Sequence, residues 1–386
     1  MFFDETVIKK CAPMLLLAVL PIMASCQQTD DGFALPPNAD IDAVAAASLA
    51  SAALQQQMPE RHDRYAIYYT ADEYAELFRT VTGSYSGIGI YIYPDDATGR
   101  ALVYGVMKGG PAYEAGILPG DVFVSINDEE LTALDYSAVA DKLLAYPEGT
   151  KLNVVLERPD VGEVALTLKT AKVEIPTLDY KMLPDNLGLI KIASFNMNTG
   201  EQFTAAYDDL IEQGMQGLIL DLRNNGGGEI NAALHICNYF VPDGQPMMYI
   251  TDAEGVYYYT ANRETVDIPL AVLQNGHSAS ASEIVIGAVK DMGAGVLIGE
   301  TTYGKGIVQD LRQLKSGAGL RFTSAKYSSA HEHDIHGVGI EADINFPMPE
   351  DAEPLADYTM EPERDPQLAK AMEILAEKLP QNEAEN

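Results

Sequence analysis

Positively charged side chains are scarce in this sequence. Its 386 residues contain 25 Lys and Arg against 57 Asp and Glu, which gives a formal net charge of −32 at pH 7. Nucleic acids and anionic surfaces are bound through clusters of Lys and Arg, so this balance argues against both as partners. The rest of the composition, 47% apolar and 21% charged, is that of a soluble globular protein, and the length suits two or three domains.

The N-terminal end lacks an apolar run long enough to cross a bilayer. Residues 12–22 are apolar but too few, and two lysines precede them. This order is typical of an export signal, and residues 23–26, MASC, resemble a bacterial lipobox in which Cys26 is lipidated. We therefore expect residues 1–26 to be a lipoprotein-type signal peptide. The protein would then lie on the extracytoplasmic face of a bacterial membrane or in the periplasm. An ordinary cleaved signal, with Cys26 incidental, is the alternative.

Cysteine is also scarce, and the three cysteines are Cys11, Cys26 and Cys237. Removal of Cys11 with the signal and lipidation of Cys26 would leave Cys237 alone. We therefore expect no disulfide, although an exported protein is free to form one. Cys237 lies inside the apolar run 232–240, which predicts a buried, inert thiol.

The N-terminal part that follows the expected signal is a polar tether and then helical sequence. The sequence as a whole contains no internal repeat. Residues 27–40 are polar with two prolines, and residues 41–57 are rich in alanine, which favours a helix. A further helix begins near Thr70, because Glu73 lies three residues on in the spacing of a capping box.

The most informative stretch is residues 275–309. A buried strand is predicted at 271–273, a turn at Asn275-Gly276, a helix at 283–292 and another strand at 295–299. A serine at such a strand-to-helix turn is exposed, and the helix N-terminus beside it favours developing negative charge. The turn carries three serines, and spacing alone leaves the choice open among Ser278, Ser280 and Ser282.

A serine hydroxyl needs a base to become a strong nucleophile. Lys305 lies between two glycines, where desolvation would favour the neutral amine that a base requires. Gln309 lies four residues further on, and its amide would be able to hold the lysine by a hydrogen bond. Serine–lysine pairs are one variant of the serine-hydrolase scheme.

The segments SASASEI, at 278–284, and GETTYGKGIVQ, at 299–309, together resemble the carboxyl-terminal processing (tail-specific) peptidases of serine peptidase family S41. The resemblance implies that Ser280 is the nucleophile, that Lys305 is the base and that Gln309 orients the lysine.

A second motif follows the apolar run 217–222, which predicts a strand leading into a Gly-rich turn and a helix. The sequence DLRNNGGG, at 221–228, resembles the DLRxNxGG motif of the same family. That resemblance implies an oxyanion hole formed by the backbone N–H groups of Gly227 and Ala281. Without it, the glycines would indicate only a turn that requires positive φ.

Residues 83–173 resemble a PDZ domain, and the segment GGPAYEAGILPGD at 109–121 is the most specific part. In such a domain, successive loop N–H groups bind a C-terminal carboxylate and the peptide adds as a strand to the sheet edge. The alternative is that the glycines of this loop only make a tight turn. The loop residues concerned are Gly87, Ile88, Gly89 and Ile90.

The resemblance implies an α/β chain (mixed α+β, multidomain). It would consist of a PDZ domain plus a ββα-rich S41 (crotonase/ClpP-like) protease core with flanking helices. The last helix, 365–379, is expected to pack on the N-terminal helices. The predicted parts are a signal peptide at 1–26, a tether and N-terminal helical segment at 27–82, the PDZ domain at 83–173, the protease core at 174–348 and an acidic tail with a helix at 349–386.

The predicted function is that of a serine endopeptidase with a Ser-Lys dyad, which cleaves extracytoplasmic proteins after its PDZ domain captures their C-terminal tails. Its expected partners are these tails and, through the lipid, a membrane; no nucleic acid, nucleotide, cofactor or metal is implied. The alternative is a non-cleaving PDZ tail-binding pseudo-protease, against which the complete Ser280, Lys305 and Gln309 set argues.

Three other patterns compete with this interpretation. Residues 299–305 nearly match a phosphate-binding loop, but Gly306 stands where Ser or Thr would bind magnesium. The sequence HEHD, at 331–334, lacks a zinc-site spacing and indicates a solvated loop. An Asp–His–Ser triad would leave the lysine segment without a role; its members would be Asp221, His277 and Ser280.

Overall fold

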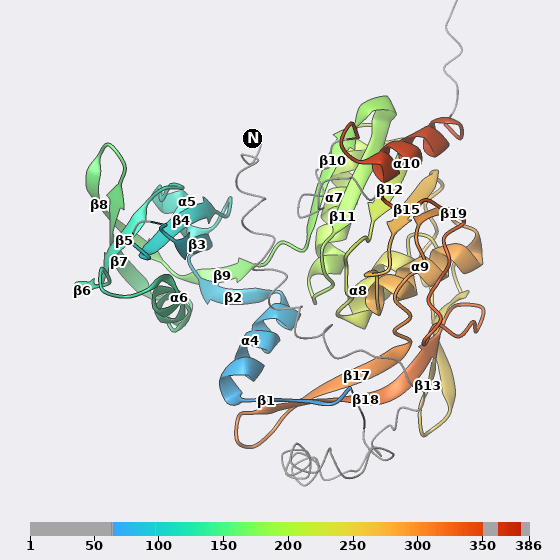
Figure 1. Cartoon of the computed structure of the whole chain (residues 1–386), viewed down its shortest axis with the longest axis horizontal. Helices are drawn as coiled ribbons and strands as arrows, with labels where there is room; N and C mark the ends of the chain where they lie inside the picture. Colours follow the sequence, from blue (N-terminus) through green and yellow to red (C-terminus); the bar gives the residue numbers. More distant parts are fainter. Residues whose placement is uncertain (1–62, 64, 97, 350–361, 380–386) are drawn as a thin grey trace, which may run out of the picture. The chain divides into compact units, whose positions relative to one another are not determined.

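The structure, a computed structural model, describes residues 63, 65–96, 98–349 and 362–379. Within them the chain folds into two compact units (Figure 1). The first spans residues 84–175, and the second contains the described residues on either side of it. The expected signal peptide, lipidation site, tether and first helix lie outside the described residues. Among those that are described, no helix has both the length and the apolar character that crossing a membrane requires.

The first unit is built on an antiparallel sheet with strand order β3-β4-β5-β7-β8, in which β6 pairs with β5, and β2 and β9 form a separate pair. Side chains of β7 alternate between buried and exposed, as expected for a sheet with one solvated face. The elements are β2 (Ser84–Gly87), β3 (Ile90–Pro94), β4 (Ala101–Val106), α5 (Pro111–Ala115), β5 (Val122–Ile126), β6 (Glu129–Glu130), α6 (Tyr136–Leu144), β7 (Lys151–Arg158), β8 (Gly162–Lys169) and β9 (Ala171–Glu174).

Local sequence sets the two helices of this unit. Pro111 starts α5, and Gly116 ends it in a left-handed conformation with φ 84°. The Asp135 side chain caps α6 by accepting from the N–H of Ala138. The unit has its own core, whose most buried members include Val103, Phe123, Ile126, Leu152 and Leu156.

The second unit contains a six-stranded sheet with the order β10-β11-β12-β15-β16-β19. The pair β10–β11 is antiparallel and the remaining pairs are parallel. Strands β12 and β15 are buried at every position, as is usual for parallel strands covered on both faces. The strands are β10 (Leu178–Leu183), β11 (Leu187–Ile192), β12 (Gly217–Asp221), β15 (Leu270–Gln274), β16 (Val296–Gly299) and β19 (Ile344–Asn345).

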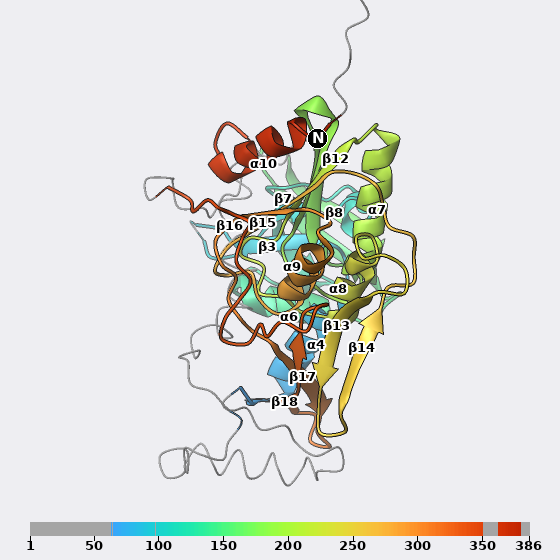
Figure 2. The same ribbon diagram turned by 90° about the vertical axis from the view of Figure 1, so that its right-hand side faces the viewer.

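Helices cover both faces of this sheet. Leu218 and Leu220 belong to a core shared with α7 (Thr199–Glu212), α8 (Ile230–Cys237) and α9 (Ala281–Met292). Ile219 faces the opposite way, into a second core formed with α10 (Pro366–Ala376), which Figure 2 shows apart from the other three helices. Helix α10 lies on β12, β15 and β16, where its apolar stripe covers their open face. The expected packing of this helix on the N-terminal helices stays a prediction, because the helix expected at 41–57 lies outside the described residues.

A second sheet packs on the far side of α9. Its order is β1-β18-β13-β14, with β17 also pairing with β18. The short N-terminal helix α4 (Ala71–Thr82) lies against β18, and its predicted capping box is confirmed by the reciprocal bonds of Thr70 and Glu73 at 2.8 and 3.3 Å. The strands are β1 (Ile67–Tyr69), β13 (Pro246–Thr251), β14 (Val256–Thr260), β17 (Ile307–Gln313) and β18 (Gly319–Ser328).

Cys237 is a free, fully buried thiol at the end of α8, as the apolar run around it predicts. Burial raises the pKa of this thiol, so it stays protonated and unreactive at neutral pH.

Candidate active site

Ser280 lies where β15 turns into α9. It is the N-cap of the helix. Its backbone has φ 56° and ψ −117°, a conformation that residues other than glycine rarely adopt. A strained strand-to-helix turn of this kind presents a serine hydroxyl above the sheet. The N–H of Ser280 donates to the Glu283 carboxylate at 2.9 Å, which fixes the turn from inside the helix.

The serines on either side of Ser280 have structural roles. Ser278 and Ser282 are fully buried, whereas Ser280 is only partly buried. The Ser278 hydroxyl donates to the carbonyl of Leu222 at 2.8 Å, and the Ser282 hydroxyl donates to the carbonyl of Asn225 at 2.9 Å. Both bonds hold the turn after β12 against the turn after β15.

Glu283 connects the Ser280 turn to the segment that carries Lys305. One carboxylate oxygen accepts from the N–H groups of Ser280 and Lys305, at 2.9 and 2.8 Å. The other accepts from the Gly304 N–H at 2.7 Å and the Thr302 hydroxyl at 2.6 Å. Burial raises the pKa of Glu283, and these four donors oppose that rise. Glu283 is not among the predicted site residues, although the S-x-x-E spacing after Ser280 is a capping-box signal that points to it.

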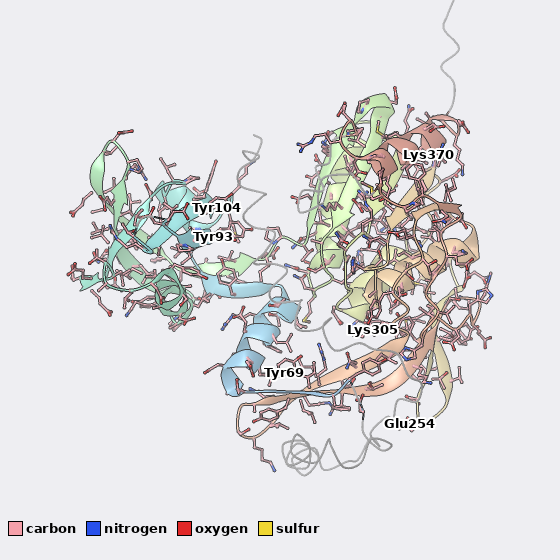
Figure 3. The ribbon with its side chains drawn as sticks, viewed as in Figure 1. Tyr69, Tyr93, Tyr104, Glu254, Lys305 and Lys370 are labelled. Carbon is pink, nitrogen blue, oxygen red and sulfur yellow. The ribbon has the colours of Figure 1, made fainter. Side chains whose placement is uncertain are left out.

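The glycines beside Lys305 allow a close approach to residues 335–339. A Cβ on Gly304 would lie 2.9 Å from the Gly339 nitrogen, and one on Gly306 would lie 2.7 Å from the His336 nitrogen. Gly304 also has φ 87°. Lys305 follows directly and lies two residues before the first residue of β17, Ile307 (Figure 3).

Gln309 lies on β17, but the contact it makes is with the N-terminal segment. Its side-chain nitrogen donates to the Tyr65 carbonyl at 2.9 Å. This bond uses one of the two N–H groups of the amide. A bond between Gln309 and Lys305 would use the amide oxygen or the second N–H, and the expected orienting role depends on these two groups.

The turn after β12 places Gly227 directly against the serine. A Cβ on Gly227, which has φ 95°, would lie 2.6 Å from the Ser280 Cβ and 2.8 Å from the Ala281 nitrogen. Ala281 is the first residue of α9, where N–H groups lack partners within the helix. The Gly227 N–H donates to the Asn225 side-chain oxygen at 2.9 Å. An oxyanion at this N–H would have to share or replace that bond.

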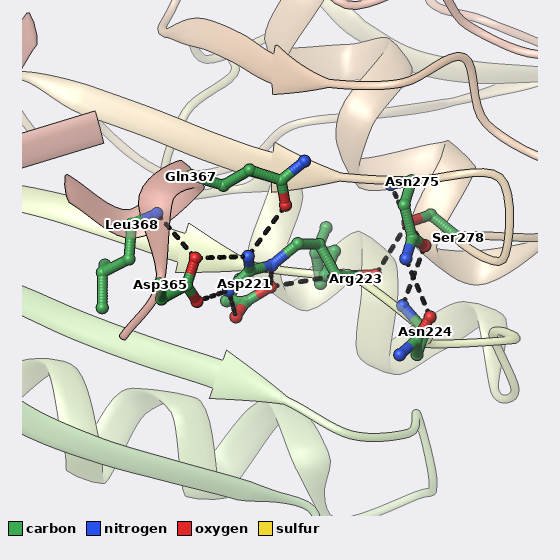
Figure 4. A network of polar contacts seen from close by, with 9 residues as sticks. Asp221, Arg223, Asn224, Asn275, Ser278, Asp365, Gln367 and Leu368 are labelled. Atoms are coloured by element: carbon green, nitrogen blue, oxygen red, sulfur yellow. Dashed lines mark hydrogen bonds and ion pairs between the residues drawn. The ribbon is translucent and has the colours of Figure 1, made fainter. Parts of the chain in front are cut away.

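Arg223 anchors the same turn through a buried ion cluster (Figure 4). Its guanidinium pairs with two carboxylates, Asp221 at 2.7 Å and Asp365 at 2.6 Å, and also donates to Gln367 at 2.8 Å. All three charged side chains are at most 3% exposed. Burial would raise the pKa of Asp221, but the charge of Arg223 and the bonds from it hold that pKa below its ordinary value. Sequence reasoning misses Asp365 because it lies 142 residues away from Arg223.

A pair of asparagines joins the two turns at the surface. The Asn224 N–H donates to the Asn275 side-chain oxygen at 3.0 Å, and the Asn275 amide returns a bond to the Asn224 side chain at 2.8 Å (Figure 4). Asn224 has φ 58°, which this side-chain type tolerates best after glycine.

The alternative triad finds no support in this arrangement. Asp221 is engaged by Arg223, so it is not available to orient a histidine. His277 is exposed, and its backbone N–H donates to Asn275 at 3.1 Å.

In the first unit, the loop between β2 and β3 is fixed by hydrogen bonds that its carbonyl groups accept from neighbouring segments. Ile88 is 2% exposed and its carbonyl accepts from the Ala112 N–H at 2.8 Å, while the Gly89 carbonyl accepts from Met107 at 2.9 Å. Gly89 has φ 77°. Strand β3 is at the edge of its sheet, with α6 packed nearby. An extended peptide would be able to add at this edge.

Comparison with known proteins gives two family matches: peptidase family S41 at residues 186–346 and a PDZ domain at residues 102–158. The chain is 33% identical over 298 residues to the carboxyl-terminal-processing protease of Synechocystis, a match that covers 75% of this chain and 69% of that protein. It is 32% identical over 305 residues to the carboxy-terminal processing protease CtpA of Bacillus subtilis. It is also 32% identical over 309 residues to a probable CtpA-like serine protease of Staphylococcus haemolyticus.

The chain spans 65% of the Bacillus protein and 61% of the Staphylococcus protein. Among solved structures, the photosystem II D1 C-terminal processing protease is 25% identical with a TM-score of 0.43, over 94% of this chain and 97% of that one. A putative S41 protease from Bacteroides fragilis is 18% identical with a TM-score of 0.48, over 98% and 99% of the two chains. With a sequence match that covers the turn after β12, the Ser280 turn and the lysine segment together, the chain belongs to peptidase family S41.

Proposed function

We propose that this chain is a serine endopeptidase in which Ser280 is the nucleophile and Lys305 the general base. The observation that carries the proposal is the shared carboxylate of Glu283, which binds the backbone N–H groups of both residues at 2.9 and 2.8 Å. A structural role alone would not require a strained serine at the helix N-terminus and a glycine-flanked lysine to be tied to one buried acid.

The reaction needs only groups of this chain and water. Neutral Lys305 accepts the hydroxyl proton as the Ser280 oxygen attacks the scissile carbonyl. The N–H groups of Gly227 and Ala281 stabilise the oxyanion. Each donor of this kind stabilises the transition state by about 3–4 kcal/mol. Lys305 then gives its proton to the leaving amine. In the second half, Lys305 removes a proton from water as the water attacks the acyl ester. Lys305 then returns this proton to the departing Ser280 oxygen, which releases the new C-terminus and restores the serine hydroxyl and the neutral lysine.

The substrate class we propose is extracytoplasmic protein with an apolar C-terminal tail. The named relatives are carboxy-terminal processing proteases, which supports tails as the target. The edge of β3 and the loop from Gly87 to Ile90 would bind the tail carboxylate and the strand before it. The lipid anchor at Cys26 is part of this proposal, and loss of fatty-acid labelling in Cys26→Ala is its test.

The decisive experiment is cleavage of an unfolded reporter with an apolar C-terminus. Ser280→Ala and Lys305→Ala are expected to reduce kcat at least about 1,000-fold, because each removes a group on which bond formation depends. His277→Ala is the matched control, since this residue is exposed beside the same turn, and it should retain activity. An active Lys305→Ala variant together with an inactive His277→Ala variant would replace the dyad by the triad. A wild-type protein that binds tails but never cleaves them would support the pseudo-protease alternative.

A further inference from the structure

The Tyr327 hydroxyl lies between the backbones of the two residues that carry the proposed reaction. It donates to the Lys305 carbonyl at 2.7 Å and to the Ser280 carbonyl at 3.0 Å. Tyr327 belongs to β18 and is 3% exposed. Its own backbone N–H donates to the Gly306 carbonyl at 3.0 Å, so the strand and the lysine segment are joined twice.

From this geometry we propose that Tyr327 is a positioning residue, whose hydroxyl sets the separation of Ser280 and Lys305. The inference rests on the proposed function of those two residues. A buried tyrosine hydroxyl must find an acceptor, and here both acceptors are carbonyls of the dyad. The single proton of the Tyr327 hydroxyl is shared between the two carbonyls. Both bonds therefore stay short only while the Ser280 and Lys305 carbonyls both point at this hydroxyl.

Tyr327 and Glu283 bind opposite backbone groups of the same two residues. Glu283 accepts the N–H groups of Ser280 and Lys305, and Tyr327 donates to their carbonyls. Strained backbone conformations persist only where the surroundings over-determine them. The two contacts provide such a restraint for Ser280, whose φ is 56°.

Removal of the hydroxyl would affect the lysine more than the serine. The Ser280 carbonyl also accepts the N–H groups of Glu283 and Ile284, at 2.8 and 3.1 Å, and so remains bonded in the helix. Lys305 would lose the hydrogen bond to its carbonyl and retain the bond from its N–H to Glu283. The expected defect is therefore a misplaced base beside an intact serine turn.

The hydroxyl keeps its proton throughout the useful pH range. Burial, and next to it the charge of Glu283, raise the pKa of Tyr327 well above its ordinary value. Tyr327 is thus a permanent donor and takes no part in proton transfer, which separates a positioning role from a catalytic one.

The test is Tyr327→Phe, which removes one oxygen atom and leaves the ring in place. We expect kcat for the reporter to fall about 10- to 100-fold, the scale that a displaced catalytic group produces, with KM changed less than about twofold. The matched control is Tyr239→Phe. Its ring is likewise buried and its hydroxyl lies 2.8 Å from Thr204, so it should lose a similar buried bond without loss of kcat.

Hydrogen exchange gives a second readout that needs no turnover. In Tyr327→Phe the N–H groups of Gly304 and Lys305 should exchange faster than in the wild type, while those of α9 stay unchanged. Replacement of Tyr327 by p-aminophenylalanine, which keeps a donor at the same place, should restore kcat to within about threefold of the wild type on the same reasoning. This variant also decides the matter if the phenylalanine variant does not fold.

Wild-type kcat in Tyr327→Phe, or a loss no larger than that in Tyr239→Phe, would overturn the positioning role. So would failure of the aminophenylalanine variant despite a native fold. The proposed function fails separately, through active Ser280→Ala or Lys305→Ala variants. If the wild type cleaves no reporter, unchanged exchange at Gly304 and Lys305 in Tyr327→Phe rejects the inference, and faster exchange supports it.

Discussion

Glu283 is the side chain on which the serine and lysine segments converge. Its two oxygens accept four hydrogen bonds, three of them from backbone N–H groups. Glutamine has the same shape but only one acceptor oxygen, and its NH2 would face donors.

We therefore expect Glu283→Gln to lower kcat about 100-fold and the free energy of unfolding by about 1–3 kcal/mol. Reporter cleavage and urea unfolding would measure the two effects. Glu300→Gln is the matched control, because that carboxylate is exposed in the segment just before Lys305. Full activity with Gln at position 283 would show that the carboxylate is not needed to align the dyad.

The sequence motifs single out Ser280 and Lys305 but not the two side chains that join them. Glu283 has a local signal, the capping-box spacing, which the serine-rich pattern obscures. Tyr327 has none: it lies 47 residues from Ser280 and 22 from Lys305 along the chain, and its partners are main-chain carbonyls that carry no sequence information. Such a contact depends on how β18 packs against α9, which local pattern does not specify.

Among the elements, α10 contributes both to the core and to the turn after β12. Asp365 caps this helix by accepting from the Leu368 N–H at 3.0 Å, and the same carboxylate pairs with Arg223. Asparagine at position 365 would keep the cap but lose the charge. Asp221 would still neutralise the buried Arg223, so the cost is smaller than that of an unpaired charge.

Asp365→Asn should therefore reduce the free energy of unfolding by about 1–3 kcal/mol. Urea unfolding at pH 7 measures this. Glu373→Gln serves as the control on the same helix, since its partner Lys370 is at the surface and the pair contributes less than about 1 kcal/mol. Equal effects of the two substitutions would mean that the buried cluster adds nothing beyond an exposed pair.

Elements with continuous apolar runs were the most predictable. Strands β12, β15 and β16 lie where the apolar runs predict them, because parallel strands covered on both faces need apolar residues at every position. Helix α9 also lies where its apolar spacing predicts it. The hairpin of β13 and β14 is not anticipated. All five residues of β14 are exposed, so it lacks the alternation that marks a half-buried strand.

At the scale of the whole molecule, the first unit has an apolar core of its own. We expect residues 83–175, expressed alone, to unfold cooperatively in urea and to bind a peptide with an apolar C-terminus. Amidation of that peptide's terminal carboxylate should abolish binding, because the loop N–H groups would lose the charge they bind. Isothermal calorimetry measures the binding of the free and the amidated peptide, and urea titration measures the unfolding. Non-cooperative unfolding, or equal binding of the two peptides, would contradict the expectation.

The path of the chain has a consequence for how the protein matures. Arg223 receives Asp365 and Gln367 from a segment made 142 to 144 residues later. A chain that emerges from its N-terminus onward therefore passes through a stage in which Ser280 and Lys305 have both appeared but the turn beside them lacks its last two ligands. We therefore expect any hydrolytic activity of the proposed dyad to appear only after α10 has been synthesised and docked, because the turn beside Ser280 has its full set of ligands only then.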